Sequence, residues 1–284
     1  MSNINQSENS PSKPNDWLLQ HRKSITSQLG EDGILEKIFQ ILPITTTDRW
    51  CVEFGAGDGA TLSNTYHLIN HQSWSSVQIE ANPRSYDLLA SRYADKAKVV
   101  CSNRVISFEG ENTLDKVLQT TPIPLDFDFL SVDIDGNDYH IWESLEVYRP
   151  KVVVIEFNPS IPHYVSHIQP KDPEVYQGSS LLALQQLGIQ KNYELVASTE
   201  WNGFFVDLQY FSLFEIQDNS IWQMNQNYQF WTYVFQLYDG TVVVGGNNRL
   251  LWHNIEVDFS EIQETIQVLP PEEIGYPGRL PDVS

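Results

Sequence analysis

Apolar residues first recur at helical spacing after a polar start to the chain. Residues 1–15 contain few apolar side chains and two prolines, so they cannot bury enough surface to offset the entropy of ordering. The pattern changes from Trp17, and between Ile34 and Leu42 apolar residues recur at helical spacing until Pro43 ends the run. The pattern predicts a disordered tail over residues 1–16, followed by an amphipathic helix that leads into a domain.

Short apolar strands and helix-like segments then alternate. Strands are expected at 50–54, 76–80, 98–101, 127–132 and 152–155. Helices are expected at 63–70, 83–94, 112–119, 139–145 and 180–187. Two further strands, 193–197 and 204–207, are joined by a short connection that indicates an antiparallel hairpin. This rhythm predicts an α/β domain over residues 17–210 with a Rossmann-like, mostly parallel sheet that the hairpin closes.

The carboxy-terminal segment, residues 211–284, differs in composition. Aromatic residues crowd together between residues 222 and 252, with one strand expected at 241–244. A proline-rich tail starts at Pro270. We expect an aromatic-rich extension that folds back on the domain and either completes its core or forms a lid over it.

The charge balance and the cysteine count narrow the classes of partner. Lys and Arg number 17 against 37 Asp and Glu, a net charge of −20, so nucleic acid and anionic membrane surfaces are poor partners. No apolar stretch approaches the roughly 18 residues of a membrane span, and the amino terminus lacks a secretory pattern. Two cysteines in apolar runs exclude a disulfide scaffold. We expect a cytoplasmic protein without membrane insertion, and the sequence leaves a homo-oligomer open.

A glycine-rich loop follows the first strand directly. The segment Glu53-Phe54-Gly55-Ala56-Gly57-Asp58-Gly59 lies where a strand ends and a helix approaches, and its glycines allow torsions and close ligand contact that a Cβ would obstruct. Glu80 ends the second strand 21 residues after Gly59, the position from which a carboxylate accepts both ribose hydroxyls. The loop therefore predicts a nucleoside site.

These residues resemble the first motif of the class I S-adenosylmethionine-dependent methyltransferases, and within them the chain is most similar to the FkbM-like family. The resemblance covers residues 27–207 and is most specific in segments 52–59, 79–83 and 131–136. It implies a seven-stranded sheet whose last hairpin is antiparallel. The family usually carries Glu where this chain has Asp135. Because the Asp side chain is shorter, the role that the family assigns to this carboxylate does not transfer directly to Asp135.

The resemblance also implies roles for individual residues. The methionine and ribose end of the cofactor would lie against Glu53, Gly55, Gly57 and Gly59. The ribose would be held by Glu80, and the adenine would be flanked by Ser102 and Asn103. Asp133, at the end of the fourth strand, would face the sulfonium and the incoming acceptor.

Acidic residues gather after the fourth and fifth strands, at the edge where open α/β sheets place their active sites. In one account, Asp133, Asp135 or His140 is catalytic, and Asp133 or His140 acts as the general base. In the other, Asp133, Asp135, Glu156 and Asn158 hold Mg²⁺ or another divalent cation, as in catechol-type methyltransferases. Both accounts stay open at this point.

The segment Gln28-Leu29-Gly30-Glu31-Asp32-Gly33 also has two interpretations. It either caps the first helix, or brings Gln28 or Glu31 over the cofactor or acceptor.

The expected function is methyl transfer from S-adenosylmethionine to an oxygen of a small-molecule, sugar or peptide-derived acceptor, in natural product biosynthesis. A nicotinamide-dependent oxidoreductase is disfavoured because Asp58 would repel a pyrophosphate. A non-catalytic cofactor-binding or interaction domain is the remaining alternative.

Overall fold

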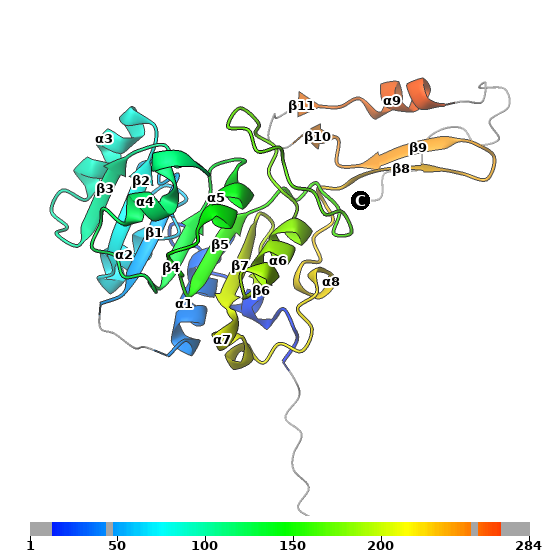
Figure 1. Cartoon of the computed structure of the whole chain (residues 1–284). Coiled ribbons are helices and arrows are strands. Elements are labelled where there is room, and N and C mark those ends of the chain that lie inside the picture. Colours follow the sequence, from blue (N-terminus) through cyan, green and yellow to red (C-terminus); the bar gives the residue numbers. More distant parts are fainter. Residues whose placement is uncertain (1–12, 44–47, 251–254, 268–284) are drawn as a thin grey trace, which may run out of the picture.

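A seven-stranded sheet forms the centre of the molecule (Figure 1). The computed structural model describes residues 13–43, 48–250 and 255–267. The sheet has the order β3-β2-β1-β4-β5-β7-β6, in which β7 runs antiparallel to the other six strands. Its strands are β1 (Trp50–Phe54), β2 (Ser75–Glu80), β3 (Val99–Asn103), β4 (Phe129–Val132), β5 (Val152–Glu156), β6 (Tyr193–Ser198) and β7 (Asn202–Asp207). The predicted fold class and its closing hairpin are confirmed.

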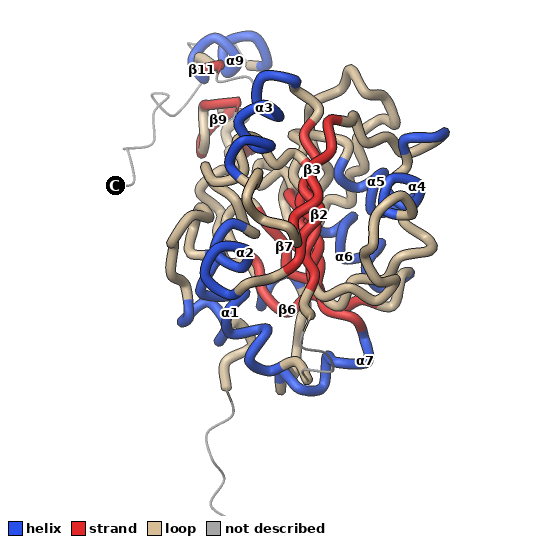
Figure 2. Tube along the Cα trace, turned by 90° about the vertical axis from the view of Figure 1, so that its left-hand side faces the viewer, coloured by secondary structure: helices blue, strands red, loops and turns tan. Residues whose placement is uncertain are grey.

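Helices cover both faces of this sheet. The α-helices are α1 (Glu31–Ile41), α2 (Tyr66–Gln72), α3 (Pro83–Arg92), α4 (Leu114–Leu118), α5 (Asp138–Ser144), α6 (Leu181–Gln190), α7 (Leu208–Phe211), α8 (Ile221–Met224) and α9 (Phe259–Ile266). Short 3-10 helices occupy Trp17–His21, Gly110–Asn112 and Ser212–Phe214. Figure 2 shows the sheet edge-on, with α1 and α2 on one side and α4, α5 and α6 on the other.

The central strands are apolar because both of their faces are covered. Every residue of β1, β4 and β5 is buried, as the continuous apolar run of β5 predicts. On the side of α5 and α6, Trp142 is fully buried and its ring centroid lies 5.0 Å from that of Phe205 on β7. This contact packs α5, the helix that follows β4, against the sheet beside β5.

The carboxy-terminal extension has two parts. Its first residues pack on the domain, where Phe214 and Met224 are buried and Trp17 donates its indole N–H to the Phe214 carbonyl at 3.0 Å. Beyond them, β8 (Thr232–Gln236) and β9 (Val242–Gly246) form an antiparallel hairpin that projects away from the sheet in Figure 1. Strand β9 corresponds to the strand expected at 241–244, and β8 was not predicted.

Three further findings concern the ends and the surface. The short strands β10 (Arg249–Leu250) and β11 (Ile255–Glu256) pair near α9. Residues 1–12 of the expected disordered tail and the expected tail from Pro270 lie outside the described residues. Within the described ranges, no helix combines the length and the apolar character that crossing a bilayer requires.

Candidate active site

The three glycines of the loop after β1 have different surroundings. All have left-handed backbones, with φ of +73° at Gly55, +54° at Gly57 and +76° at Gly59. A Cβ on Gly55 would lie 2.0 Å from the carbonyl oxygen of Asp133, and one on Gly59 would lie 2.5 Å from Leu89 Cδ1. A Cβ on Gly57 would have no heavy atom of the described residues within 4 Å. Gly57 is therefore the glycine of this loop whose backbone a ligand can approach.

Glu80, at the end of β2, holds the open glycine. Its Oε2 accepts the N–H of Gly57 at 2.7 Å, and its Oε1 accepts the N–H of Asn82 at 2.7 Å. Asn103, at the end of β3, donates its side-chain amide to the Glu80 carbonyl at 2.8 Å. Since each carboxylate oxygen has a second lone pair, Glu80 can also accept ribose hydroxyls. The structure thus brings Gly57, Glu80, Asn103 and the preceding Ser102 to one edge of the sheet.

Glu53 is buried against the segment that follows the glycine loop. Its Oε2 accepts the hydroxyls of Ser63 and Thr65, both at 2.6 Å, and its Oε1 accepts the N–H of Asn64 at 2.9 Å. Burial raises the pKa of Glu53, and these hydrogen bonds oppose that rise. The contacts show that Glu53 shapes residues 63–65, and its contact with a cofactor stays a prediction.

Three carboxylates meet at the carboxyl ends of β4 and β5. One side-chain oxygen each from Asp133, Asp135 and Glu156 lies within 4.8 Å of the others. Asp135 has a left-handed backbone with φ of +58°, which non-glycine residues adopt rarely. Asp138, at the start of α5, fixes this turn because its carboxylate accepts two backbone N–H groups of the turn, both at 2.9 Å.

The negative charges of these carboxylates repel one another. Burial and then the charges of Asp138 and Asp135 raise the pKa of Asp133. Burial and then the charge of Asp133 raise the pKa of Glu156 well above its ordinary value. The Oε2 of Glu156 is buried and has no hydrogen-bond partner in the part of the chain that the structure describes. Among the described residues, no ion pair joins a Lys, Arg or His to the three carboxylates. The cluster therefore needs protons or an external cation.

His140 and Asn158 make other contacts. The Nε2 of His140 donates to the Gln169 carbonyl at 2.9 Å, and its Nδ1 faces Glu143 at 3.7 Å. The side-chain oxygen of Asn158 accepts the N–H and O–H of Ser160. In the described parts of the chain, no hydrogen bond joins either side chain to the three carboxylates. The assigned roles of His140 as a base and Asn158 as a metal ligand stay predictions.

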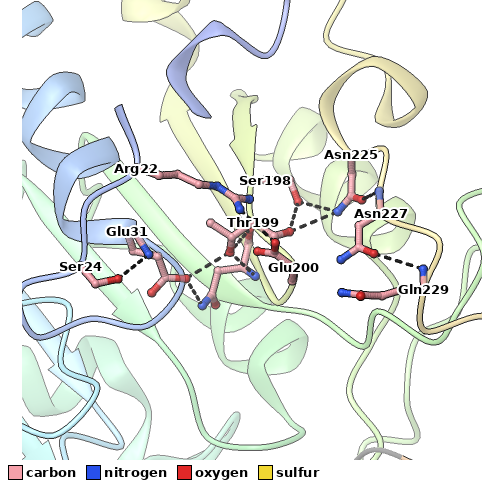
Figure 3. Close-up of polar contacts among 11 residues, drawn as sticks. Arg22, Ser24, Glu31, Ser198, Thr199, Glu200, Asn225, Asn227 and Gln229 are labelled. Carbon is pink, nitrogen blue, oxygen red and sulfur yellow. Dashed lines mark hydrogen bonds and ion pairs between the residues drawn. The ribbon is translucent and has the colours of Figure 1, made fainter. Parts of the chain in front are cut away.

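Glu31 is a buried acid that was expected either to cap α1 or to cover the ligands. One of its oxygens accepts hydrogen bonds from Thr199, in the turn after β6, and from Asn202, the first residue of β7, 168 and 171 residues later in the chain (Figure 3). The first interpretation rests on the fact that acids are common in the first turn of a helix. Nothing local in the sequence reports a partner so distant.

Comparisons with known proteins add information on the fold alone. The sequence matches no protein-family model and no curated protein. Similar solved structures include TrmK of M. capricolum bound to S-adenosyl-homocysteine, at 9% identity and a TM-score of 0.35 over 60% of this chain. The citrinin polyketide synthase CMeT domain has 9% identity and a TM-score of 0.42 over 65%, and the CurJ carbon methyltransferase has 8% and 0.43 over 66%. The chain spans 66%, 55% and 56% of these three chains, less than two thirds of each.

Proposed function

We propose that the chain is an S-adenosylmethionine-dependent methyltransferase, FkbM-like in type, that methylates an oxygen of a small-molecule, sugar or peptide-derived acceptor. The open backbone of Gly57, held at 2.7 Å by Glu80, carries the proposal. A nucleoside fits here because the exposed backbone of Gly57 and the carboxylate of Glu80 lie together at the carboxyl ends of the strands. The N–H of Thr61 holds the pKa of Asp58 below its usual range, and Arg92 pairs with the Asp58 carboxylate at 3.0 Å. The loop therefore carries an occupied ion pair where a dinucleotide would place its pyrophosphate.

The residues divide the work of binding and positioning. S-adenosylmethionine supplies a methyl group activated by a sulfonium charge. Glu80 would accept the ribose hydroxyls, and Ser102 and Asn103 would flank the adenine at the end of β3. Asp133 would lie nearer the sulfonium, where the acidic cluster opposes its positive charge.

A leucine at position 57 tests the cofactor site. We expect Gly57→Leu to weaken S-adenosylhomocysteine binding at least about 100-fold in calorimetric titration, because the side chain would fill the space that the ligand needs. Gly110→Leu is the matched control, since Gly110 also has a left-handed backbone, φ +77°, and open space at its Cβ position. Equal affinities for the two variants, or no binding by the wild type, would contradict the proposal.

Metal assistance is the second candidate, and the three clustered carboxylates favour it. Their oxygens are hard donors, which divalent cations such as Mg²⁺ prefer. The Oε2 of Glu156 is buried and has no hydrogen-bond partner among the described residues, so a bound cation could pair with it. Asp133, Asp135 and Glu156 would hold Mg²⁺ or a similar ion. The ion would supply a positive charge that lowers the pKa of an acceptor hydroxyl.

Mn²⁺ titration followed by electron paramagnetic resonance tests this candidate. We expect one bound ion in the wild type and at least about tenfold weaker binding by Asp135→Asn, since one of few charged ligands is lost. Asp87→Asn removes an exposed acid on α3 and should bind Mn²⁺ like the wild type. Unchanged affinity in Asp135→Asn would exclude the cluster as the cation site.

A further inference from the structure

Glu31 is the first residue of α1, yet its side chain is fully buried. An acid at a helix start normally faces solvent, where it interacts favourably with the helix dipole. Gly30 precedes it with φ of +82°, and a Cβ there would lie 2.6 Å from Cβ of Arg22. This tight turn holds the start of α1 against the preceding segment and directs Glu31 inward.

One oxygen of Glu31 is fixed and the other is free. Its Oε1 accepts the side-chain amide of Asn202 at 2.7 Å and the hydroxyl of Thr199 at 3.1 Å. Its Oε2 is buried and has no hydrogen-bond partner among the described residues. Figure 3 shows the polar chain that continues from Thr199 to Asn225 of the extension, which bonds Ser198 at 2.9 Å. A buried carboxyl oxygen left without a partner needs a ligand, a water or a proton.

Glu31 lies at the same edge of the sheet as the acidic cluster. Asn202, its partner, stands opposite Glu156 in the register of β5 and β7. The charge of Glu31 raises the pKa of both Asp133 and Glu156, so the three carboxyls act on one another.

Two charged groups of the amino-terminal segment also face Glu31. Asp32, the next residue, repels it, and Arg22 attracts it weakly. The Oδ2 of Asp32 is engaged by three backbone N–H groups and the Ser27 hydroxyl, and Arg22 pairs with Glu200 at 2.9 Å. Neither group therefore neutralises the free oxygen of Glu31.

We propose that Glu31 accepts the proton that the methyl acceptor loses, and that the acceptor accordingly presents an O–H or N–H group at this edge. The inference rests on the proposed methyltransferase function and adds a catalytic residue to it. For a hydroxyl acceptor, an oxygen lone pair forms the bond to the methyl carbon, and the carbon–sulfur bonding pair moves to sulfur. The hydroxyl proton moves to Oε2 of Glu31. The products are the methyl ether, S-adenosylhomocysteine and a neutral Glu31, which returns its proton to water.

The protonation behaviour of Glu31 suits this task. Burial raises its pKa from 4.5 to about 7, against the opposing hydrogen bonds from Asn202 and Thr199. A general base works best when its pKa lies near the working pH.

Proton-linked calorimetry with S-adenosylmethionine and S-adenosylhomocysteine tests the inference on the full chain. The two ligands differ by the methyl group and its positive charge, which favours the ionised form of a carboxyl that faces it. We expect the difference in protons released between the ligands at about pH 7 to fall by about half a proton in Glu31→Gln, since a group is half protonated at its pKa. Glu36→Gln, a partly buried acid on the same helix, should behave like the wild type.

The variant Thr199→Val supplies a second measurement, the pH of maximal proton release, which would not move if Glu31 had only a structural role. Losing the hydroxyl that lowers the pKa of Glu31 should move the pH of maximal proton release upward. Binding of both ligands with equal proton release in wild type and Glu31→Gln, or an unmoved maximum in Thr199→Val, would overturn the role of Glu31 alone. Failure of the wild type to bind either ligand would instead remove the proposed function as well.

Discussion

Replacing Glu156 by glutamine should stabilise the protein at about pH 8 by about 2–4 kcal/mol, although it removes a native charge. Burial and the neighbouring Asp133 raise the pKa of Glu156 well above 4.5 in the folded state. At about pH 8 the folded protein must therefore either retain a proton against the solution or ionise a buried group beside like charges. Glutamine has a similar shape and avoids both penalties.

The pH dependence of this effect follows from proton counts. Between the ordinary pKa and the raised one, the folded state holds more protons at position 156 than the unfolded state. The contribution of Glu156 to the free energy of unfolding consequently falls as pH rises above 4.5. Below that pH both states are protonated, so the wild type and Glu156→Gln should differ little at about pH 4 and diverge toward about pH 8.

Urea unfolding at several pH values, in the presence of a chelator that removes divalent ions, measures this divergence. Glu174→Gln is the control, because Glu174 is exposed and its removal should leave the pH profile unchanged. A Glu156→Gln variant that is less stable than the wild type at about pH 8 would show that the carboxylate is compensated within the protein.

The sheet could be predicted because its burial leaves a continuous apolar pattern. The uninterrupted apolar residues of β5 predict a central strand, and the short segment before β7 predicts a hairpin connection. The extension was less predictable. Its strand β8 carries Tyr233, Val234 and Phe235, which are 39–55% exposed, although aromatic and branched residues in such a run suggest a core.

The acidic site was partly predictable for a similar reason. Parallel strands bring their carboxyl ends to one edge, so Asp133 and Glu156 could be placed together from strand positions alone. The partnership of Glu31 with Asn202 could not, because it depends on how α1 packs against a turn 171 residues away. Likewise, Glu53 has the position of a ligand-binding acid, but the fold around residues 63–65 saturates one of its oxygens.

The second large effect should come from alanine at Gly55. We expect Gly55→Ala to lose about 3 kcal/mol or more of unfolding free energy, because its Cβ would lie 2.0 Å from the Asp133 carbonyl oxygen. The Asp133 carbonyl oxygen belongs to the backbone that follows β4, so it cannot move aside as the end of a flexible side chain can. Therefore β1 and the turn that carries Asp133 must separate. The left-handed φ of +73° adds about 1–2 kcal/mol of strain.

Gly57→Ala isolates the clash from the backbone strain. Gly57 has a similar left-handed φ of +54°, but no described atom lies within 4 Å of its Cβ position, so alanine there should cost only about 1–2 kcal/mol. The free energies of unfolding of the two variants, measured by thermal and urea unfolding, should therefore differ by about 2 kcal/mol, with Gly55→Ala the less stable. Equal losses would mean that β1 and β4 do not approach this closely, and that the position of Asp133 beside the glycine loop is set by something else.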